Sequence, residues 1–145
     1  LMRALLDANV LIALFDEDHV FNERAHVWLE ENASAGIATC PFTENALVRV
    51  LSHPKYSKTL RSTPAELITG LVEFVEYHDH VFWPDNLSIR SEPHFDRKRM
   101  LGSRQLTDIY LLSLAIANEG RLVTFDDHIA ISAVPVSRPE HLLVI

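Results

Sequence analysis

The chain has 145 residues, of which 48% are hydrophobic, and it carries a formal net charge of −7. This length and composition suit one ordered domain that covers residues 1–145, and they argue against a disordered tail. The negative charge argues against binding of nucleic acid by the whole surface, so any such contact requires clustered basic residues.

The first half of the chain predicts two strands and four helices. The strands are residues 3–6 and 37–40, and the helices are residues 8–15, 21–32, 41–51 and 64–77. Thr63 caps the last of these helices, and Glu66 closes a capping box with it. In the second helix Phe21, Trp28 and Leu29 fall on one face, which predicts burial, or a partner surface if part of it is exposed.

The second half begins with a strand at residues 81–83 and continues with a polar, irregular stretch at 84–104. Residues 106–118 are apolar nearly all round, which predicts a helix buried between layers and ended by Gly120. Residues 122–125 form a fourth strand, and 134–136 a short fifth. Short apolar strands separated by helices indicate an α/β fold with a parallel sheet covered on both faces.

Four acidic residues stand where these elements meet. Asp7 and Asp126 follow strands, Asp108 begins the central helix, and Glu44 lies in the first turn of the helix after the second strand. Because open parallel sheets bind ligands beyond the carboxyl ends of their strands, we expect all four acids at one edge. Such carboxylates repel one another unless divalent cations neutralise them.

Each acid also has a structural reading when it is taken alone. An acid after a strand or in a first helical turn often caps the helix, favours its dipole or makes a turn. Four acids on four separate elements are harder to explain in that way, so the pattern favours a Mg²⁺ or Mn²⁺ site that hydrolyses phosphodiesters. Thr124, in contrast, is sufficiently explained as a β-branched strand residue.

Four segments of the chain form a recognisable series. They read LLDANVLIALFD at 5–16, TENALVRVL at 43–51, LTDIYLLSLAIANEGRLVTFDDHI at 106–129 and VPVSRPEHL at 134–142. In their order and spacing these segments resemble the PIN-domain family, and in particular the VapC-type toxins of bacterial toxin–antitoxin pairs. The resemblance implies a three-layer α/β/α domain with about five mostly parallel strands. It also implies metal-dependent cleavage of RNA, possession of a cognate antitoxin that occludes the acidic pocket, and a homodimer.

Carried over by position, the family's acidic quartet falls on Asp7, Glu44, Asp108 and Asp126. Its supporting polar positions fall on Asn9 and Thr107, and Thr107 also suits the cap of the central helix. The adjacent acids Asp126 and Asp127 leave the fourth position open, and the strand end at residue 125 favours Asp126.

Basic residues gather upstream of Asp108 in this acidic chain. They are Arg97, Lys98, Arg99 and Arg104. RNA affinity needs positive charge near the cleavage site, so we assign these residues to RNA binding, with a solvated surface loop as the alternative reading. The substrate expected from the resemblance is a structured RNA such as tRNA.

Several other functions can be weighed against the ribonuclease. A PIN-like module that binds RNA or protein without cleaving is the main alternative. A phosphoacceptor receiver and a small-ester phosphatase each lack their acid motifs after Asp7, where Ala8 and Asn9 stand. The triplet His78-Asp79-His80 resembles a metal pair, but nothing nearby in sequence completes a zinc site.

The remaining features concern the compartment. No apolar run is long enough to cross a membrane, and the first residues lack the charged start and apolar stretch of a secretory signal. Cys40 is the single cysteine, which excludes an internal disulfide. A reducing, cytoplasmic setting fits these observations.

Overall fold

In a computed structural model that describes residues 2–145, the backbone forms a five-stranded sheet in the order β3-β2-β1-β4-β5, with every neighbouring pair parallel. The strands are β1 (Ala4–Leu6), β2 (Ile37–Thr39), β3 (His80–Phe82), β4 (Arg121–Thr124) and β5 (Leu142–Val144). The helices are α1 (Ala8–Phe15), α2 (Asn22–Asn32), α3 (Pro41–Leu51), α4 (Pro64–Tyr77) and α5 (Leu106–Ala117). The expected α/β fold with a parallel sheet is therefore confirmed.

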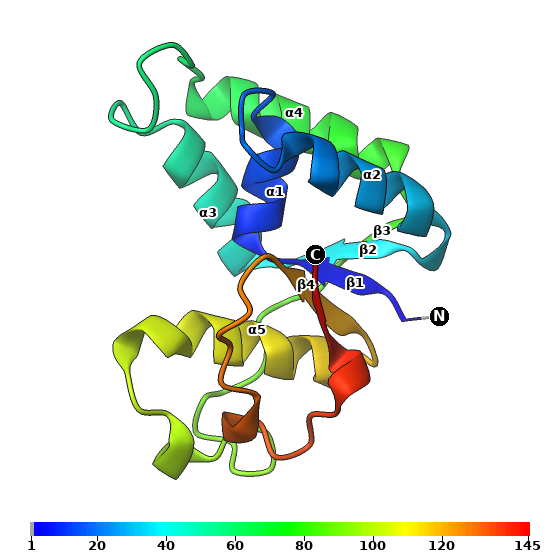
Figure 1. The fold of residues 1–145 in the computed structure, drawn as a ribbon, viewed down its shortest axis with the longest axis vertical. Coiled ribbons are helices and arrows are strands. Elements are labelled where there is room, and N and C mark those ends of the chain that lie inside the picture. Colours follow the sequence, from blue (N-terminus) through cyan, green and yellow to red (C-terminus); the bar gives the residue numbers. More distant parts are fainter. Residues whose placement is uncertain (1) are drawn as a thin grey trace.

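The sheet separates two hydrophobic layers. Helices α1 to α4 lie on one face, and α5 lies on the other (Figure 1). Side chains alternate along the central strand, because Ala4 and Leu6 pack toward the first group of helices while Leu5 packs toward α5. The strands read as continuous apolar runs because both faces of the sheet are covered.

The central helix is buried as its sequence predicts. Every residue from Ile109 to Ala115 is buried in the layer beneath the sheet. Among residues 2–145, no helix combines the length and the apolar character that a membrane crossing requires.

The end of α5 differs from the expected glycine cap. Glu119, with φ of 59°, takes the left-handed position, and its N–H and that of Gly120 bond back to the carbonyls of Ile116 and Ala115. Gly120 is required for a different reason, because there is no space for a side chain at this position. A Cβ there would lie 2.6 Å from the Arg3 carbonyl oxygen and 2.5 Å from the Trp83 ring.

The fifth strand is not where the sequence reading placed it. Residues 134–136 form a bend and turn, and the edge strand β5 pairs Leu142–Val144 with β4. Pro135 has no N–H to give to a sheet ladder, which explains why this apolar triplet is not a strand.

The predicted capping box of α4 is confirmed. The Thr63 side chain accepts a hydrogen bond from the Glu66 N–H, and the Glu66 side chain accepts one from the Thr63 N–H.

Candidate active site

Asp7 is a buried carboxylate at the carboxyl end of the central strand. It caps α1 by accepting a hydrogen bond from the Ala8 N–H at 2.7 Å, and it accepts a second from Thr124 Oγ1 at 2.7 Å. Burial raises the pKa of Asp7 above its ordinary value of 3.8, and the charge of Asp126 adds to this, while the two hydrogen bonds act in the opposite direction. Asp7 therefore caps α1 and is also part of the candidate site.

Thr124 connects three of the polar groups around Asp7. Its fully buried hydroxyl donates to Asp7 and accepts from the Asp126 N–H at 3.1 Å and from Asn9 Nδ2 at 3.4 Å. The carbonyl oxygen Oδ1 of Asn9 is buried and has no hydrogen-bond partner within residues 2–145. Sequence reasoning had treated Thr124 as an ordinary strand residue, although a hydroxyl at the end of an apolar strand was the signal of its role.

Asp108 and Asp126 complete a cluster with Asp7, which we call the acidic cluster. Burial is the main cause that raises the pKa of Asp108 to about 6, and the charges of Asp7 and Asp126 and a side-chain hydrogen bond with Asp126 contribute to this shift. The neighbouring Asp127 lies largely in solvent and pairs with the His128 ring at 3.2 Å, so Asp126 is the acid of this pair in the cluster.

Glu44 is held in a separate hydrogen-bonded group. It accepts from Thr39 Oγ1 at 2.6 Å, and that same hydroxyl lies 2.7 Å from Nε2 of His80. Because the Thr39 hydroxyl has one proton and donates it to Glu44, the Nε2 of His80 acts as the donor to Thr39. Burial lowers the pKa of His80, the charge of Glu44 opposes this shift, and the charges of Arg3 and His78 add to it.

Three of the four predicted acids, Asp7, Asp108 and Asp126, thus form the acidic cluster. The fourth, Glu44, is hydrogen-bonded to Thr39 instead. The neighbouring charges named as raising the pKa of Asp7 and Asp108 are those of other members of the acidic cluster. In the part of the chain that the structure describes, no three Asp, Glu, His or Cys side chains already form a metal cage. The donor chemistry nevertheless fits a hard divalent cation, because carboxylate oxygens and the unpaired Asn9 Oδ1 are ligands of the kind that Mg²⁺ and Mn²⁺ take.

Thr107 does not cap α5. Gln105 takes the cap position without a side-chain hydrogen bond, and Thr107 is an exposed residue of the first turn. The hydroxyl therefore does not bond the helix end as its sequence position suggested.

The basic residues upstream of α5 divide into two groups. Arg97 pairs with Glu92 and Arg99 with Asp96, each at 3.3 Å. Arg104, in contrast, lines a small hollow of about 210 Å³ together with Asp108 and Asp126. Of the predicted RNA-binding residues, Arg104 is the one that the fold places beside the acidic cluster, while Arg97 and Lys98 line a separate hollow with Phe95.

The triplet at residues 78–80 does not converge on a metal site. His78 Nδ1 lies 2.8 Å from the Phe74 carbonyl oxygen, and Asp79 pairs with Arg3 at 2.9 Å. His80 turns toward Thr39 instead. The three side chains therefore have three separate structural partners.

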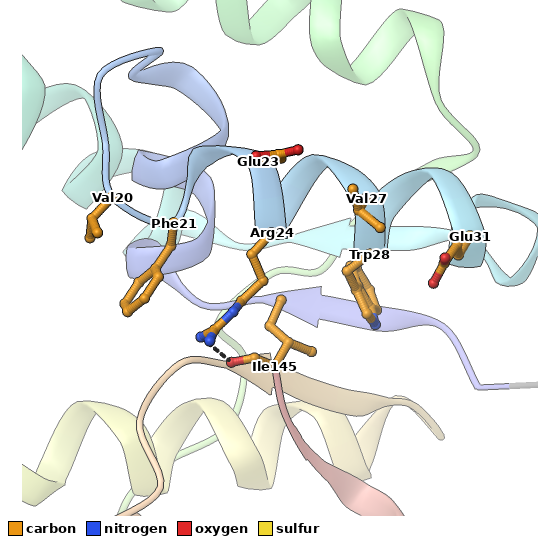
Figure 2. A pocket seen from close by; sticks show the side chains of 8 residues that line it. All are labelled: Val20, Phe21, Glu23, Arg24, Val27, Trp28, Glu31 and Ile145. Carbon is orange, nitrogen blue, oxygen red and sulfur yellow. Dashed lines mark hydrogen bonds between the residues drawn. The ribbon is translucent and has the colours of Figure 1, made fainter.

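A hollow of about 740 Å³ lies along α2 and is lined by none of the candidate acids (Figure 2). Leu29 of the predicted stripe is buried, whereas Phe21 and Trp28 are half-buried and line this hollow beside Ile145. Arg24 lies over the Phe21 ring at 4.6 Å and reaches the Ile145 carbonyl oxygen at 3.4 Å. The stripe is thus part core and part accessible apolar surface.

Comparison with known proteins gives a consistent family. The model of the PIN domain matches residues 4–134. Ribonuclease VapC44 of Mycobacterium tuberculosis (strain H37Rv) is 44% identical over 141 residues, which cover 97% of this chain and 98% of that protein. Ribonuclease VapC39 of the same organism is 40% identical over 132 residues, covering 91% of this chain and 94% of its own length.

A solved structure supports the same fold. It is described as VapBC2 from Rickettsia felis bound to a DNA fragment from their promoter, and it matches with a TM-score of 0.61 at 18% identity. The match covers 99% of this chain and 98% of that one. With a matching domain model, two relatives of 44% and 40% identity over nearly their whole length and the same α/β/α architecture, this chain belongs to the PIN domain family.

Proposed function

We propose that the protein is a divalent-metal-dependent endoribonuclease and the toxin of a VapBC-type toxin–antitoxin pair. The relatives that match over nearly the whole chain are named ribonucleases of the VapC group. The observation that carries the chemistry is the acidic cluster, where Asp108 lies close enough to Asp126 and to the buried Asp7 for their charges to help raise its pKa to about 6. Such crowding of carboxyl groups is favourable once a cation neutralises it.

In this proposal Asp7 and Asp108 hold the principal ion, and Asp126 and Glu44 complete the site. A bound Mg²⁺ or Mn²⁺ supplies a positive charge that acidifies water and offsets the charge of the phosphodiester. Thr124 keeps Asp7 in one orientation through its 2.7 Å hydrogen bond. Arg104 offers a donor to a backbone phosphate at the mouth of the hollow it shares with Asp108.

In this scheme Glu44 would bind the ion through Oε1, because Thr39 donates to Oε2. The observation that Glu44 stands apart also favours the alternative function, a PIN-like module that binds RNA or protein without cleaving it.

The decisive experiment compares wild-type protein with Asp108→Ala and Asp127→Ala. A structured RNA pool that includes tRNA is incubated with Mg²⁺, Mn²⁺ or EDTA. We expect cleavage with either metal, none in EDTA, none by Asp108→Ala, and wild-type cleavage by the matched acid variant Asp127→Ala. Retained cleavage by Asp108→Ala contradicts the ligand assignment, and metal-independent binding without cleavage by wild type favours the binding module.

The proposed antitoxin is supported by the similar solved structure, which is a VapBC complex, and the proposed homodimer rests on the family resemblance alone. A cognate antitoxin that covers the acidic cluster and a second copy of the chain are both part of the proposal. Light scattering of the purified chain tests the homodimer, and inhibition of RNA cleavage by the co-expressed neighbouring gene product tests the antitoxin. A monomer at micromolar concentration, or cleavage that no such product inhibits, contradicts the corresponding part.

A further inference from the structure

A further hollow, which we call the α3 pocket, is lined by residues of α3, which carries Glu44, and by Thr107 of α5, which carries Asp108. It has a volume of about 560 Å³ and is lined by residues that include Phe42, Asn45, Arg49, Asp85 and Thr107. Asn45 follows Glu44 in the chain and Thr107 precedes Asp108, so the chain neighbours of two candidate acids line the pocket. Its volume is in the range of small-molecule sites.

The α3 pocket has an aromatic wall that is held in place from behind. Phe42 is 45% exposed, and its ring centroid lies 5.2 Å from that of the buried Tyr110. Tyr110 in turn stacks on Phe95, with the ring planes 13° apart. A large apolar ring that remains half exposed while its neighbours are fixed is a preformed surface for stacking a nucleobase.

The polar groups of the pocket are free to meet a ligand. Phe42, Asn45 and Arg49 recur at spacings of three and four residues, so they share one face of α3. Within residues 2–145, neither Arg49 nor Asp85 takes part in an ion pair, although both line the same hollow. One cation and one carboxylate therefore remain available beside the aromatic wall.

This combination selects a nucleotide more readily than an apolar peptide. Arg49 complements a backbone phosphate, Phe42 stacks on a base, and Asp85 accepts hydrogen bonds from a base edge that carries N–H donors. Guanine presents two such donors side by side, N1–H and the 2-amino group, which match the two oxygens of a carboxylate. Adenine and cytosine each offer a single amino group on that edge, and uracil a single imide N–H.

We propose that the α3 pocket binds an unpaired guanine next to the scissile phosphate, with Asp85 reading its edge and Phe42 stacking on its ring. This inference rests on the proposed ribonuclease function and adds to it a base preference and a substrate subsite. The site reads a flipped-out or single-stranded base, since the edge that meets Asp85 is the one used in Watson–Crick pairing.

The test compares single-stranded RNA oligonucleotides that carry one guanine or one inosine at the same position, since inosine lacks only the 2-amino group. For wild type we expect kcat/KM to fall about tenfold on replacing guanine with inosine. For Asp85→Asn we expect guanine and inosine to be cleaved equally. Phe42→Leu should raise KM about tenfold with kcat unchanged, Phe42→Tyr should restore it, and Ile68→Ala, at an exposed apolar site on α4, should match wild type.

Three outcomes overturn the proposal. An unchanged guanine preference in Asp85→Asn, while cleavage itself is intact, removes the pocket but leaves the ribonuclease function standing. A Phe42→Leu variant that turns a dimer into a monomer in light scattering assigns this face to contact between two copies. If wild type cleaves nothing, fluorescence anisotropy with the same labelled oligonucleotides still decides, because equal affinity for guanine and inosine excludes the pocket.

Discussion

Asp108 makes the folded chain less stable at neutral pH than it is in acid, and Asp108→Asn should remove that cost. The pKa of Asp108 is raised from 3.8 to about 6 by burial and by the charges of Asp7 and Asp126. A carboxyl group whose pKa is higher in the folded state binds a proton more tightly there than in the unfolded chain. Its penalty is therefore absent below about pH 4, grows between pH 4 and 6, and is complete above pH 6.

The full shift corresponds to about 3 kcal/mol. Because Asp108 is partly exposed, solvent screening reduces the expected effect to about 1–2 kcal/mol. Urea unfolding in EDTA measures it at pH 4 and pH 7.5, and Asp127→Asn is the exposed control. We expect Asp108→Asn to equal wild type at pH 4 and to exceed it by this amount at pH 7.5. An equal difference at both pH values refutes the electrostatic reasoning and indicates a packing effect.

Three further predictions concern hydroxyl groups and the end of α5. Thr124→Val should leave the Asp7 carboxylate without its 2.7 Å donor and reduce RNA cleavage about 10–100-fold, measured under Mg²⁺ titration; unchanged cleavage at every Mg²⁺ concentration contradicts the role. Glu119→Gly should stabilise the chain by about 0.5–1 kcal/mol, because glycine takes the left-handed backbone conformation without strain. Gly120→Ala should destabilise the chain, because the added Cβ would clash with Arg3 and Trp83. Thermal unfolding measures both variants, and the opposite ranking contradicts the proposed strain. Thr63→Ala should cost about 1 kcal/mol in urea unfolding, and no loss means that the capping box does not contribute.

The layered fold could be predicted because its determinants are local. A sheet covered on both faces is indicated by apolar strands, such as residues 3–6 and 122–125, and by the helix 106–117, which is apolar on all sides. The fifth strand could not be placed by apolarity alone, since 134–136 and 142–144 are both short apolar runs. The proline in the first run was the distinguishing signal, because a strand that ends a ladder must still donate to its neighbour.

The sequence could predict where the backbone places the acids, but it could not predict which partners their side chains meet. Strand order brings the residues after β1 and β4 together, and the parallel register between these strands fixes Asp7 near Asp126. Glu44 sits on a helix, where the side-chain direction depends on which donor it meets. No periodicity in the sequence indicates that Thr39 supplies that donor.

The two threonines that sequence reasoning passed over follow one rule. Thr39 ends β2 and Thr124 ends β4, each is fully buried, and each gives its proton to a carboxylate of the candidate site. A β-branched residue suits the last position of a strand, and its hydroxyl reaches the acid on the following helix or the neighbouring strand without disturbing the ladder. A buried hydroxyl without a hydrogen-bond partner costs free energy, so each threonine requires its carboxylate acceptor and also holds that carboxylate in one orientation.

Electrostatics explains why the fourth acid has its own donor. The acidic cluster already holds a carboxyl group with a pKa of about 6, and a fourth carboxylate placed among the three would raise these pKa values further. The Thr39 hydroxyl and the His80 N–H behind it form a chain of donors that ends on Glu44 and keeps its charge outside the cluster. The separate hydrogen bond of Glu44 therefore leaves three carboxyl groups in the acidic cluster, and a divalent cation would offset the repulsion among them.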